Sequence, residues 1–306
     1  VRWSKQPKPT IGGVGMMISY LIGGALLFLV FGNSMVLFLS IPLFLAAIVG
    51  LIDDLKAVKA MYKLVMQVIC GLLLYSIHFG FHTPMPDFFD CFLTVFWTVL
   101  IMNSINMLDN MDGISGAVSL VSFIILAVFF NMRQWLFPCS MVHILFALIS
   151  LGFLLFNKPT SRMFMGDAGS QFLGVALAAG TMLFMSTGGL MREPTKAFWC
   201  MLVLLLPALA DTGLVVVNRI RFKTSPFIGG RDHSTHNFAY LGMSGKGVFW
   251  LFAGLSTVGA LLVYKIQTSS TNLFLYISVT YVVVYLMLIF KASSINLKNN
   301  KYTYKP

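Results

Sequence analysis

Polar residues of the kinds that bind metal ions and phosphates gather in four short patches of an otherwise apolar sequence. The richest patch is residues 104–113, SINMLDNMDG, which lies between two apolar runs. Asn106, Asp109 and Asp112 have the spacing i, i+3, i+6, so a helix would present all three on one face. Carboxylate and amide oxygens clustered in this way suit Mg²⁺ or Mn²⁺. Capping of a helix that begins near residue 114 is the simpler alternative, and it explains only one aspartate.

A second patch, residues 53–56 (DDLK), ends an apolar run. Acidic residues at a helix C-terminus oppose the helix dipole, so a functional role for Asp53 and Asp54 is favoured over a solvated helix end. Adjacent helical side chains point in different directions, so at most one of the two faces a shared target. Lys63 and Gln67 follow at i, i+4 on one helix face. Lys63 either contacts a phosphate or extends its ammonium group to the membrane surface.

The third patch is residues 164–170, FMGDAGS, with Asn157 upstream. Asp167 stands where an apolar run starts, and a helix N-cap is one interpretation of it. The small residues after it would also let an anion approach the helix N-terminus, which is the alternative. Phe164 by itself is typical of an aromatic residue at a membrane interface.

The fourth patch is residues 229–237, GGRDHSTHN. It places His233 and His236 at i, i+3 beside Arg231. The patch has no cysteine and no third histidine, which favours contact with diphosphate oxygens over a zinc site. Asp211 is separate, inside a later apolar run and about two turns before two arginines, and either a functional role or a structural ion pair fits it.

The elements that must position these patches are membrane spans. The chain has 306 residues, of which 58% are hydrophobic and 10% are charged, against about 25% charged in a soluble domain. The four cysteines all lie in apolar runs and have no ligand spacing. We therefore predict an all-α polytopic membrane protein, a single domain over 1–306 with about ten transmembrane helices. The predicted spans are 11–31, 35–51, 63–80, 91–108, 114–131, 138–156, 168–186, 197–217, 247–265 and 273–290.

Basic residues predict the orientation of these spans. One set of loops holds 17 lysine and arginine residues and the other set holds 4. By the positive-inside rule both ends of the chain are expected in the cytoplasm, and all four patches fall on that side. The net charge of +11 then reflects cytoplasmic loops, and we expect no nucleic acid partner.

Taken in order, the patches resemble the polyprenyl-phosphate N-acetylhexosamine-1-phosphate transferases of glycosyltransferase family 4. These proteins start bacterial cell-envelope glycan assembly, and they include the phospho-MurNAc-pentapeptide transferases. The resemblance covers nearly the whole chain. It rests on residues 9–13 (PTIGG), the Asp53-Asp54 pair, Lys63 with Gln67, and the patches at 103–113, 164–167 and 231–237.

The resemblance implies an active site at the cytoplasmic face of the inner (plasma) membrane. There a UDP-sugar, usually UDP-GlcNAc, and undecaprenyl phosphate would give the polyprenyl-diphospho-sugar and UMP with Mg²⁺, or Mn²⁺ in its place. It also leaves a homodimer open. The implied metal contacts are Asp167 and Asn106. The implied catalytic or diphosphate-contacting residues are Asp53, Asp54, Asp109, Asp112, His233 and His236. The implied substrate-binding residues are Lys63, Asn110, Asn157, Phe164 and Arg231, with Phe164 stacked on the uracil.

Three departures from the family pattern are visible. Thr235 and Asn237 stand in the loop where many relatives carry three histidines, and Asn110 replaces a more usual glycine. Relatives also carry one more helix before residue 9, so we expect a piece of a longer protein.

Two other activities remain as alternatives, and a third is disfavoured. Phospho-MurNAc-pentapeptide transfer differs from GlcNAc-1-phosphate transfer only in the donor. A proton-coupled transporter would place its ionisable residues near the membrane midplane, where only Asp211 falls. A CDP-alcohol transferase would carry an Asp-Gly-x-x-Ala-Arg signature, which this sequence lacks.

Overall fold

The computed structural model describes residues 8–83, 86–189, 193–225 and 230–298, and within these ranges it contains helices and no strand. Eight helices are long and apolar enough to cross a membrane. This confirms the predicted all-α polytopic membrane protein. The long helices are α1 (Gly12–Phe31), α2 (Met35–Leu55), α4 (Asp87–Leu108), α5 (Ile114–Asn131), α6 (Phe137–Asn157), α7 (Gly166–Ser186), α11 (Gly245–Thr268) and α12 (Leu273–Lys298).

The two remaining predicted spans differ from expectation. The span predicted at 63–80 is α3 (Ala60–Ser76), whose 17 residues cover about 26 Å, less than the roughly 30 Å of a bilayer core. The span predicted at 197–217 is not a single helix. Two helices, α8 (Pro194–Leu204) and α9 (Leu206–Arg221), meet there at a bend of 70°. Pro207, the second residue of α9, has no backbone N–H, so the hydrogen-bond ladder of α8 cannot continue through it.

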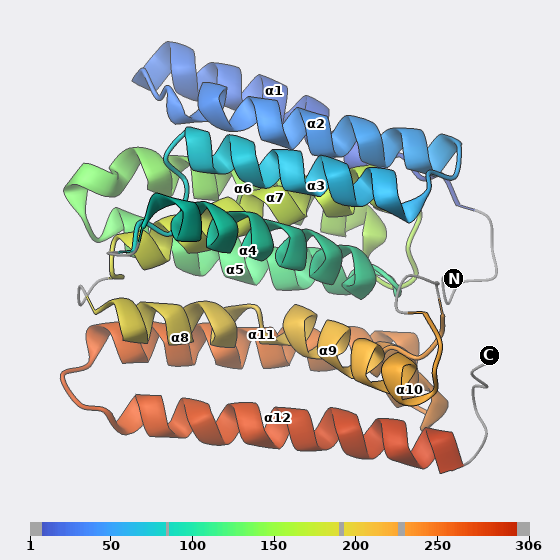
Figure 1. The fold of residues 1–306 in the computed structure, drawn as a ribbon. Helices are drawn as coiled ribbons and strands as arrows, with labels where there is room; N and C mark the ends of the chain where they lie inside the picture. Colours follow the sequence, from blue (N-terminus) through green and yellow to red (C-terminus); the bar gives the residue numbers. More distant parts are fainter. Residues whose placement is uncertain (1–7, 84–85, 190–192, 226–229, 299–306) are drawn as a thin grey trace.

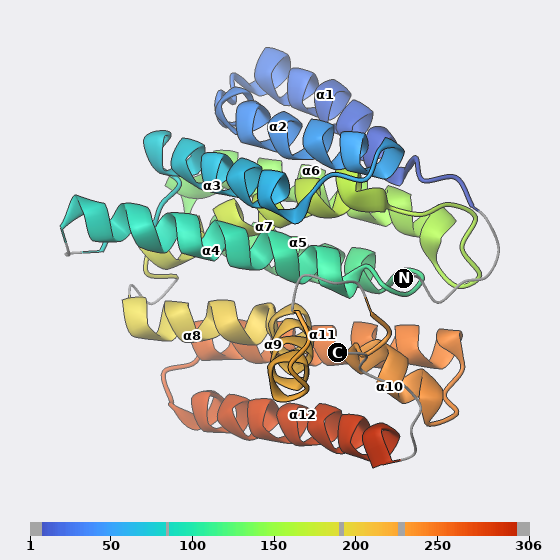
Figure 2. The same cartoon turned by 45° about the vertical axis from the view of Figure 1, so that its right-hand side comes forward.

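Helix α7 lies at the centre of the bundle. It packs against α1, α2, α4, α5 and α8. In its most apolar 18-residue stretch 89% of the residues are buried, compared with 17% in the corresponding stretches of α1 and α12. In Figure 1, α1 and α2 lie at the top, α3 to α7 form the middle, and α8, α9, α11 and α12 form the bottom. The turned view in Figure 2 keeps this order.

Small residues allow α7 to be approached closely. Gly50 on α2 lies so near that an added Cβ would stand 2.5 Å from the Asp167 carbonyl carbon and 2.6 Å from the Ala168 nitrogen. Glycine at such crossings lets helix backbones come together in a membrane. Gly50, Asp53 and Asp54 have the spacing i, i+3, i+4, so the face of α2 that meets α7 also carries the two aspartates.

All four polar patches lie at one end of the bundle, which we call the polar end. There α2 and α4 end, α3, α5 and α7 begin, and the short α10 (Ser234–Tyr240) follows α9 (right-hand side of Figure 1). A short 3-10 helix, η1 (Gln134–Leu136), lies between α5 and α6. Five of the lysine and arginine residues counted for the orientation lie outside the described ranges, namely Arg2, Lys5, Arg192, Lys301 and Lys305. Gly229, the first residue of the fourth patch, lies outside them too.

Candidate active site

Two carboxylates from different helices converge on one ammonium group at the polar end. Lys63 Nζ on α3 lies 2.5 Å from Asp53 Oδ2 on α2 and 2.6 Å from Asp167 Oδ2 on α7. The three side chains are between 15% and 26% exposed, so this cluster is partly open to solvent. Paired carboxylates repel each other unless a cation stands between them, and here Lys63 supplies that charge.

Asp54 has a different surrounding from Asp53. Its Oδ1 accepts a hydrogen bond from the Asp167 backbone N–H (2.9 Å) and its Oδ2 accepts from the Ala168 N–H (3.1 Å). The N-terminus of α7 is therefore capped by a carboxylate from α2, where charge and free N–H groups favour an anion. The interpretation of Asp167 as the N-cap is wrong, because Asp167 lies in the first turn. Gly166 permits the approach, since its φ is +74° and an added Cβ would collide with the Asp54 carboxylate.

One helical turn below this cluster, carboxamides repeat the link between α3 and α7. Gln67 Nε2 donates to Gln171 Oε1 (3.1 Å), and Asn103 Nδ2 on α4 donates to Gln67 Oε1 (2.8 Å). Lys63 and Gln67 are four residues apart, as are Asp167 and Gln171. The same two faces therefore meet at two successive turns, which fixes where Lys63 and Asp167 stand.

The aspartates of the 104–113 patch lie on the turn between α4 and α5. Asp109 Oδ1 accepts a hydrogen bond from Ser115 Oγ (2.8 Å) in the first turn of α5. Asp112 does not cap α5, whose N-cap residue is Gly113 at φ +80°. Instead Asp112 Oδ2 accepts from the Ser161 N–H (3.2 Å) and lies 3.4 Å from Lys8 Nζ.

Asn157 ties this turn to the loop before α7. Its Oδ1 accepts from the Gly113 N–H (2.8 Å), and its Nδ2 donates to the Met163 carbonyl (2.6 Å). Its side chain is 2% exposed, and both of its polar atoms contact backbone. This geometry makes Asn157 a support for the neighbouring Phe164, whose ring lies 5.2 Å from Lys8 Nζ.

The histidine segment, residues 230–237, is anchored by Asp211. The His233 Nδ1–H donates to Asp211 Oδ2 (2.8 Å), and the Ser234 N–H donates to Asp211 Oδ1 (2.6 Å). A carboxylate on Nδ1 fixes the tautomer and leaves Nε2 as the nitrogen for another contact. Asp211 is therefore the partner of the histidine segment and not of the arginines that follow it in α9.

The other ionisable groups of this segment differ in how deeply they are buried. Arg219 binds Asp232 through two hydrogen bonds of 2.9 and 2.8 Å. Burial alone would raise the pKa of the Asp232 carboxyl, but this guanidinium lowers it below its ordinary value. Burial, and then the nearby His233 ring, lower the pKa of His236 to about 3, so His236 is neutral at pH 7. Arg231 is the exposed cation of the segment.

The histidine segment touches the aspartate turn. Thr235 Oγ1 donates to Asn110 Oδ1 at 2.5 Å, and Asn110 Nδ2 donates to the Met107 carbonyl at 2.8 Å. The second and fourth patches are thus joined directly, across 125 residues of sequence.

Oxygen atoms at the centre of the site suit a hard divalent cation. Asp53 and Asp167 already share one positive group. Asn106 on α4 donates through Nδ2 to Ser170 Oγ (2.8 Å), so its amide oxygen is the atom that could bind a cation. Carboxylate and amide oxygens are what Mg²⁺ prefers. Within the described part of the chain no group of three or more histidine, cysteine or carboxylate side chains is gathered as a metal cluster.

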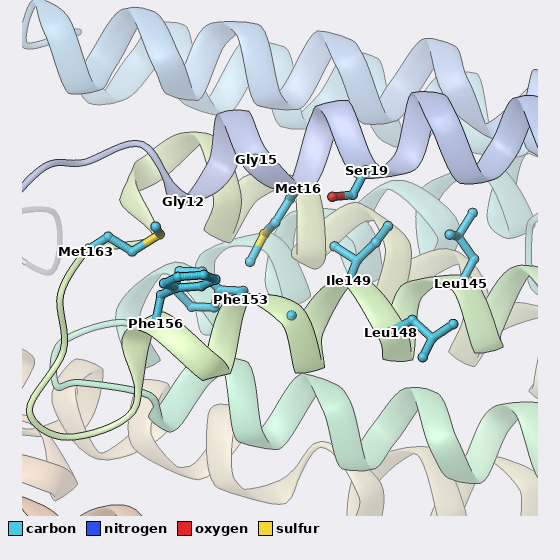
Figure 3. Close-up of a pocket in the computed structure, with 11 residues that line it drawn as sticks. Gly12, Gly15, Met16, Ser19, Leu145, Leu148, Ile149, Phe153, Phe156 and Met163 are labelled. Atoms are coloured by element: carbon cyan, nitrogen blue, oxygen red, sulfur yellow. The ribbon is translucent and has the colours of Figure 1, made fainter.

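An apolar groove of about 360 Å³ lies between α1 and α6. Figure 3 shows Gly12, Phe153, Phe156 and Met163 at one end and Leu145 and Leu148 at the other. None of the carboxylates described above lines it, so the groove is separate from the Asp53, Lys63 and Asp167 cluster.

The structure brings the predicted residues together in three groups, and sequence reasoning missed several of their partners. The groups are Asp53, Asp54, Lys63, Asn106 and Asp167; then Asp109, Asp112, Asn157 and Phe164; then Arg231, His233 and His236, joined to the second group through Asn110. Lys8 was missed as a site residue although it directly precedes the PTIGG motif. Ser115 and Ser161 carry no sequence signal of their own, because only the tertiary contacts select them. Ser170 and Thr235 stand inside the third and fourth patches, but only the tertiary contacts reveal their partners.

Comparisons with known proteins agree with this architecture. The glycosyl transferase family 4 profile matches residues 35–187, from α2 to α7. A phospho-N-acetylmuramoyl-pentapeptide-transferase of Streptococcus uberis is 30% identical over 81% of this chain and 79% of its own length. One from Listeria monocytogenes is 28% identical over 84% and 83%. A probable undecaprenyl-phosphate N-acetylglucosaminyl 1-phosphate transferase of Bacillus subtilis is 25% identical over 87% and 76%. The chain therefore belongs to glycosyl transferase family 4.

Proposed function

We propose that this protein transfers a sugar 1-phosphate, with GlcNAc-1-phosphate as the first choice, from a UDP-sugar to undecaprenyl phosphate. The products are undecaprenyl-diphospho-sugar and UMP, and the reaction begins a cell-envelope polysaccharide. The observation that carries this proposal is the convergence of Asp53 and Asp167 on Lys63 at the polar end of a membrane bundle. A lipid head group and a water-soluble nucleotide can meet only at such a boundary. The names of the relatives support the same class of reaction.

The chemistry joins two polyanions. An oxygen of the lipid phosphate attacks the phosphorus that carries the sugar, and the bond from that phosphorus to the bridging oxygen breaks so that UMP leaves. Positioning and charge neutralisation supply most of the catalysis in such transfers. Lys63 and the exposed Arg231 are the proposed sources of positive charge. The lipid phosphate is largely ionised near pH 7, so only its remaining proton needs an acceptor.

Asp53, and not Asp54, is the proposed acceptor of that proton. Asp53 Oδ2 faces Lys63, the group that would bind an incoming phosphate. Both oxygens of Asp54 accept backbone hydrogen bonds from α7. We therefore assign Asp54 to positioning Asp167.

Asp167 and the Asn106 amide oxygen are the proposed ligands of Mg²⁺, with Asp53 beside them. When bound, Mg²⁺ supplies charge neutralisation on the diphosphate. Lys63 would turn from the carboxylates toward phosphate in that state, because its ammonium now stands between them. We also propose that Asp109 faces the diphosphate of the donor.

The uridine is proposed to lie at the Lys8, Asp112 and Phe164 edge. The Phe164 ring is half-buried and lies beside the Lys8 ammonium group. The ring suits stacking on an aromatic base, and the ammonium suits a carbonyl oxygen or a phosphate. Asn157 is proposed to hold this edge in shape through Gly113 and Met163.

The donor sugar is the least constrained part of the proposal. One relative's name specifies phospho-N-acetylmuramoyl-pentapeptide and another's N-acetylglucosaminyl 1-phosphate, so both donors belong in the test. The purified protein in detergent would receive undecaprenyl phosphate and radiolabelled UDP-GlcNAc or UDP-MurNAc-pentapeptide, with and without Mg²⁺. We expect Mg²⁺-dependent lipid labelling and UMP release with UDP-GlcNAc, both abolished by Asp167→Asn. Lipid labelling by neither donor would refute the proposed function, and near-normal turnover of Asp167→Asn would refute the metal assignment.

A further inference from the structure

One buried hydrogen bond joins the histidine segment to the aspartate turn. Thr235 is fully buried and Asn110 is 8% exposed, and the Thr235 hydroxyl donates to Asn110 Oδ1. Asn110 is itself held, because its Nδ2 donates to the Met107 carbonyl of the last turn of α4. The carboxamide therefore has both of its polar atoms in protein contacts, and its orientation is set by backbone.

The histidine segment is held from its other sides as well. Asp211 on α9 accepts from Ser234 and His233. Asn296 on α12 donates to the carbonyl and the side-chain oxygen of Asn237 (2.9 and 3.0 Å). These contacts attach the segment to α9 and α12, at the bottom of the bundle in Figure 1. The Thr235 hydroxyl attaches it to the α4–α5 turn, which carries Asp109 and Asp112.

From this placement we propose that Asn110 and Thr235 are positioning residues that fix the distance between the histidine segment and the aspartate turn, and that neither contacts substrate. The inference rests on the proposed function, because the two surfaces it joins are the two sides of the proposed phosphate site. A hydrogen bond in a water-poor site is strong, and breaking one partner leaves the other buried and unpaired. Small displacements of groups that contact a transition state lower kcat more than they weaken ground-state binding.

The test uses Thr235→Val, which keeps the shape and removes the hydroxyl, and Thr235→Ser, which restores a donor. We expect Thr235→Val to lower kcat per folded enzyme about 10-fold or more, with KM for the UDP-sugar changed less than about 2-fold. Thr235→Ser should recover most of kcat. The matched control is Thr98→Val on α4, a fully buried threonine whose hydroxyl bonds only to the Thr94 carbonyl of its own helix. It should keep wild-type kcat.

Variants of Asn110 distinguish a positioning role from contact with substrate. Asn110→Ala should lower kcat like Thr235→Val, and the double variant should be no worse than either single one, since both remove the same bond. A raised KM for the UDP-sugar in Asn110→Ala, with additive losses in the double variant, would mean that Asn110 contacts the donor and would overturn the proposal. Failure of Thr235→Ser to recover kcat would overturn it too.

A second measurement does not depend on turnover. Backbone hydrogen exchange of residues 233–240 should speed up in Thr235→Val and stay at the wild-type rate in Thr98→Val. If the wild-type protein transfers no sugar phosphate, the proposed function fails while this exchange experiment still decides whether the bond holds the segment. Unchanged exchange in Thr235→Val would overturn the inference.

Discussion

At the scale of single residues, adjacent aspartates in one helix end have separate tasks. Asp53 reaches across to Lys63, whereas Asp54 turns toward α7 and accepts two of its first N–H groups. Side chains one position apart on a helix point in different directions, which the sequence predicted. Which aspartate faces which partner depends on the register of α2 against α7, and no property of the DDLK motif reveals that register.

This separation predicts different outcomes for the two isosteric variants. Asp53→Asn should lower kcat by about 100-fold or more, because the proposed acceptor of the proton is lost, and should change the melting temperature little, since Lys63 keeps Asp167 as a partner. Asp54→Asn, in contrast, should lower the melting temperature. The Nδ2 of the new asparagine cannot accept a hydrogen bond, so one N–H of α7 loses its partner at a cost of about 1–2 kcal/mol. Activity and thermal unfolding of both variants in detergent check this, and equal melting temperatures would contradict it.

His236 predicts a pH dependence of stability. Its folded pKa of about 3 lies below the ordinary value of 6.5, so between these values the unfolded chain binds the proton and the folded protein does not. Stability should therefore fall as pH is lowered from about 6.5, by up to about 1.4 kcal/mol per pH unit from this group. The melting temperature measured from pH 7.5 to 4.5 checks this, and His236→Gln should flatten the slope. The Asp232 carboxyl stays ionised over that range, since its pKa is lowered. A slope that is identical in the variant would contradict the prediction.

At the scale of helices, glycine decides how closely the side chains of the candidate site approach one another. Gly50→Ala would place a Cβ 2.5 Å from the α7 backbone, so α2 must move away and take Asp53 and Asp54 with it. We expect a lower melting temperature and at least about a 10-fold loss of activity. Gly254→Ala on α11 is the control, because an added Cβ there meets nothing within 4 Å. Equal behaviour of the two variants would show that this crossing does not position the site.

Helix identity was far easier to predict than helix contacts. Apolar runs located the eight helices that are long enough to span, together with the shorter α3 and the bent pair α8 and α9, because span lengths follow from the bilayer. The four patches pointed to one end. The break in the eighth span was missed although Pro207 marks it, because proline is tolerated in many membrane helices. The capping of α7 by Asp54 was missed for another reason, since a cap normally comes from the same chain segment. Asn110 and Thr235, which looked like two unrelated departures from the family pattern, contact each other, and only the folded structure shows it.

At the scale of the whole molecule, the bundle is asymmetric along its long axis. The polar end collects Asp53, Asp109, Asp112, Asp167 and the histidine segment (Figure 1). At the opposite end the charged groups serve local structure, as where Arg133 donates to the Thr187 and Gly189 carbonyls beyond α7. The proposed UDP-sugar donor requires the polar end to face the cytoplasm, which the distribution of lysine and arginine also predicts.

This orientation predicts which engineered cysteines a membrane-impermeant maleimide can reach in intact cells. Thr160→Cys lies in the exposed loop before α7 at the polar end, and Thr271→Cys lies in the exposed turn between α11 and α12 at the opposite end. The background carries Cys91→Ser, because Cys70, Cys139 and Cys200 are buried and Cys91 is partly exposed. We expect Thr271→Cys to be labelled in intact cells and Thr160→Cys only after permeabilisation. The reverse pattern would place the site on the wrong side for a cytoplasmic UDP-sugar. The test reports topology and not turnover. The reverse labelling pattern would therefore contradict the proposed reaction even if every site residue were correctly assigned.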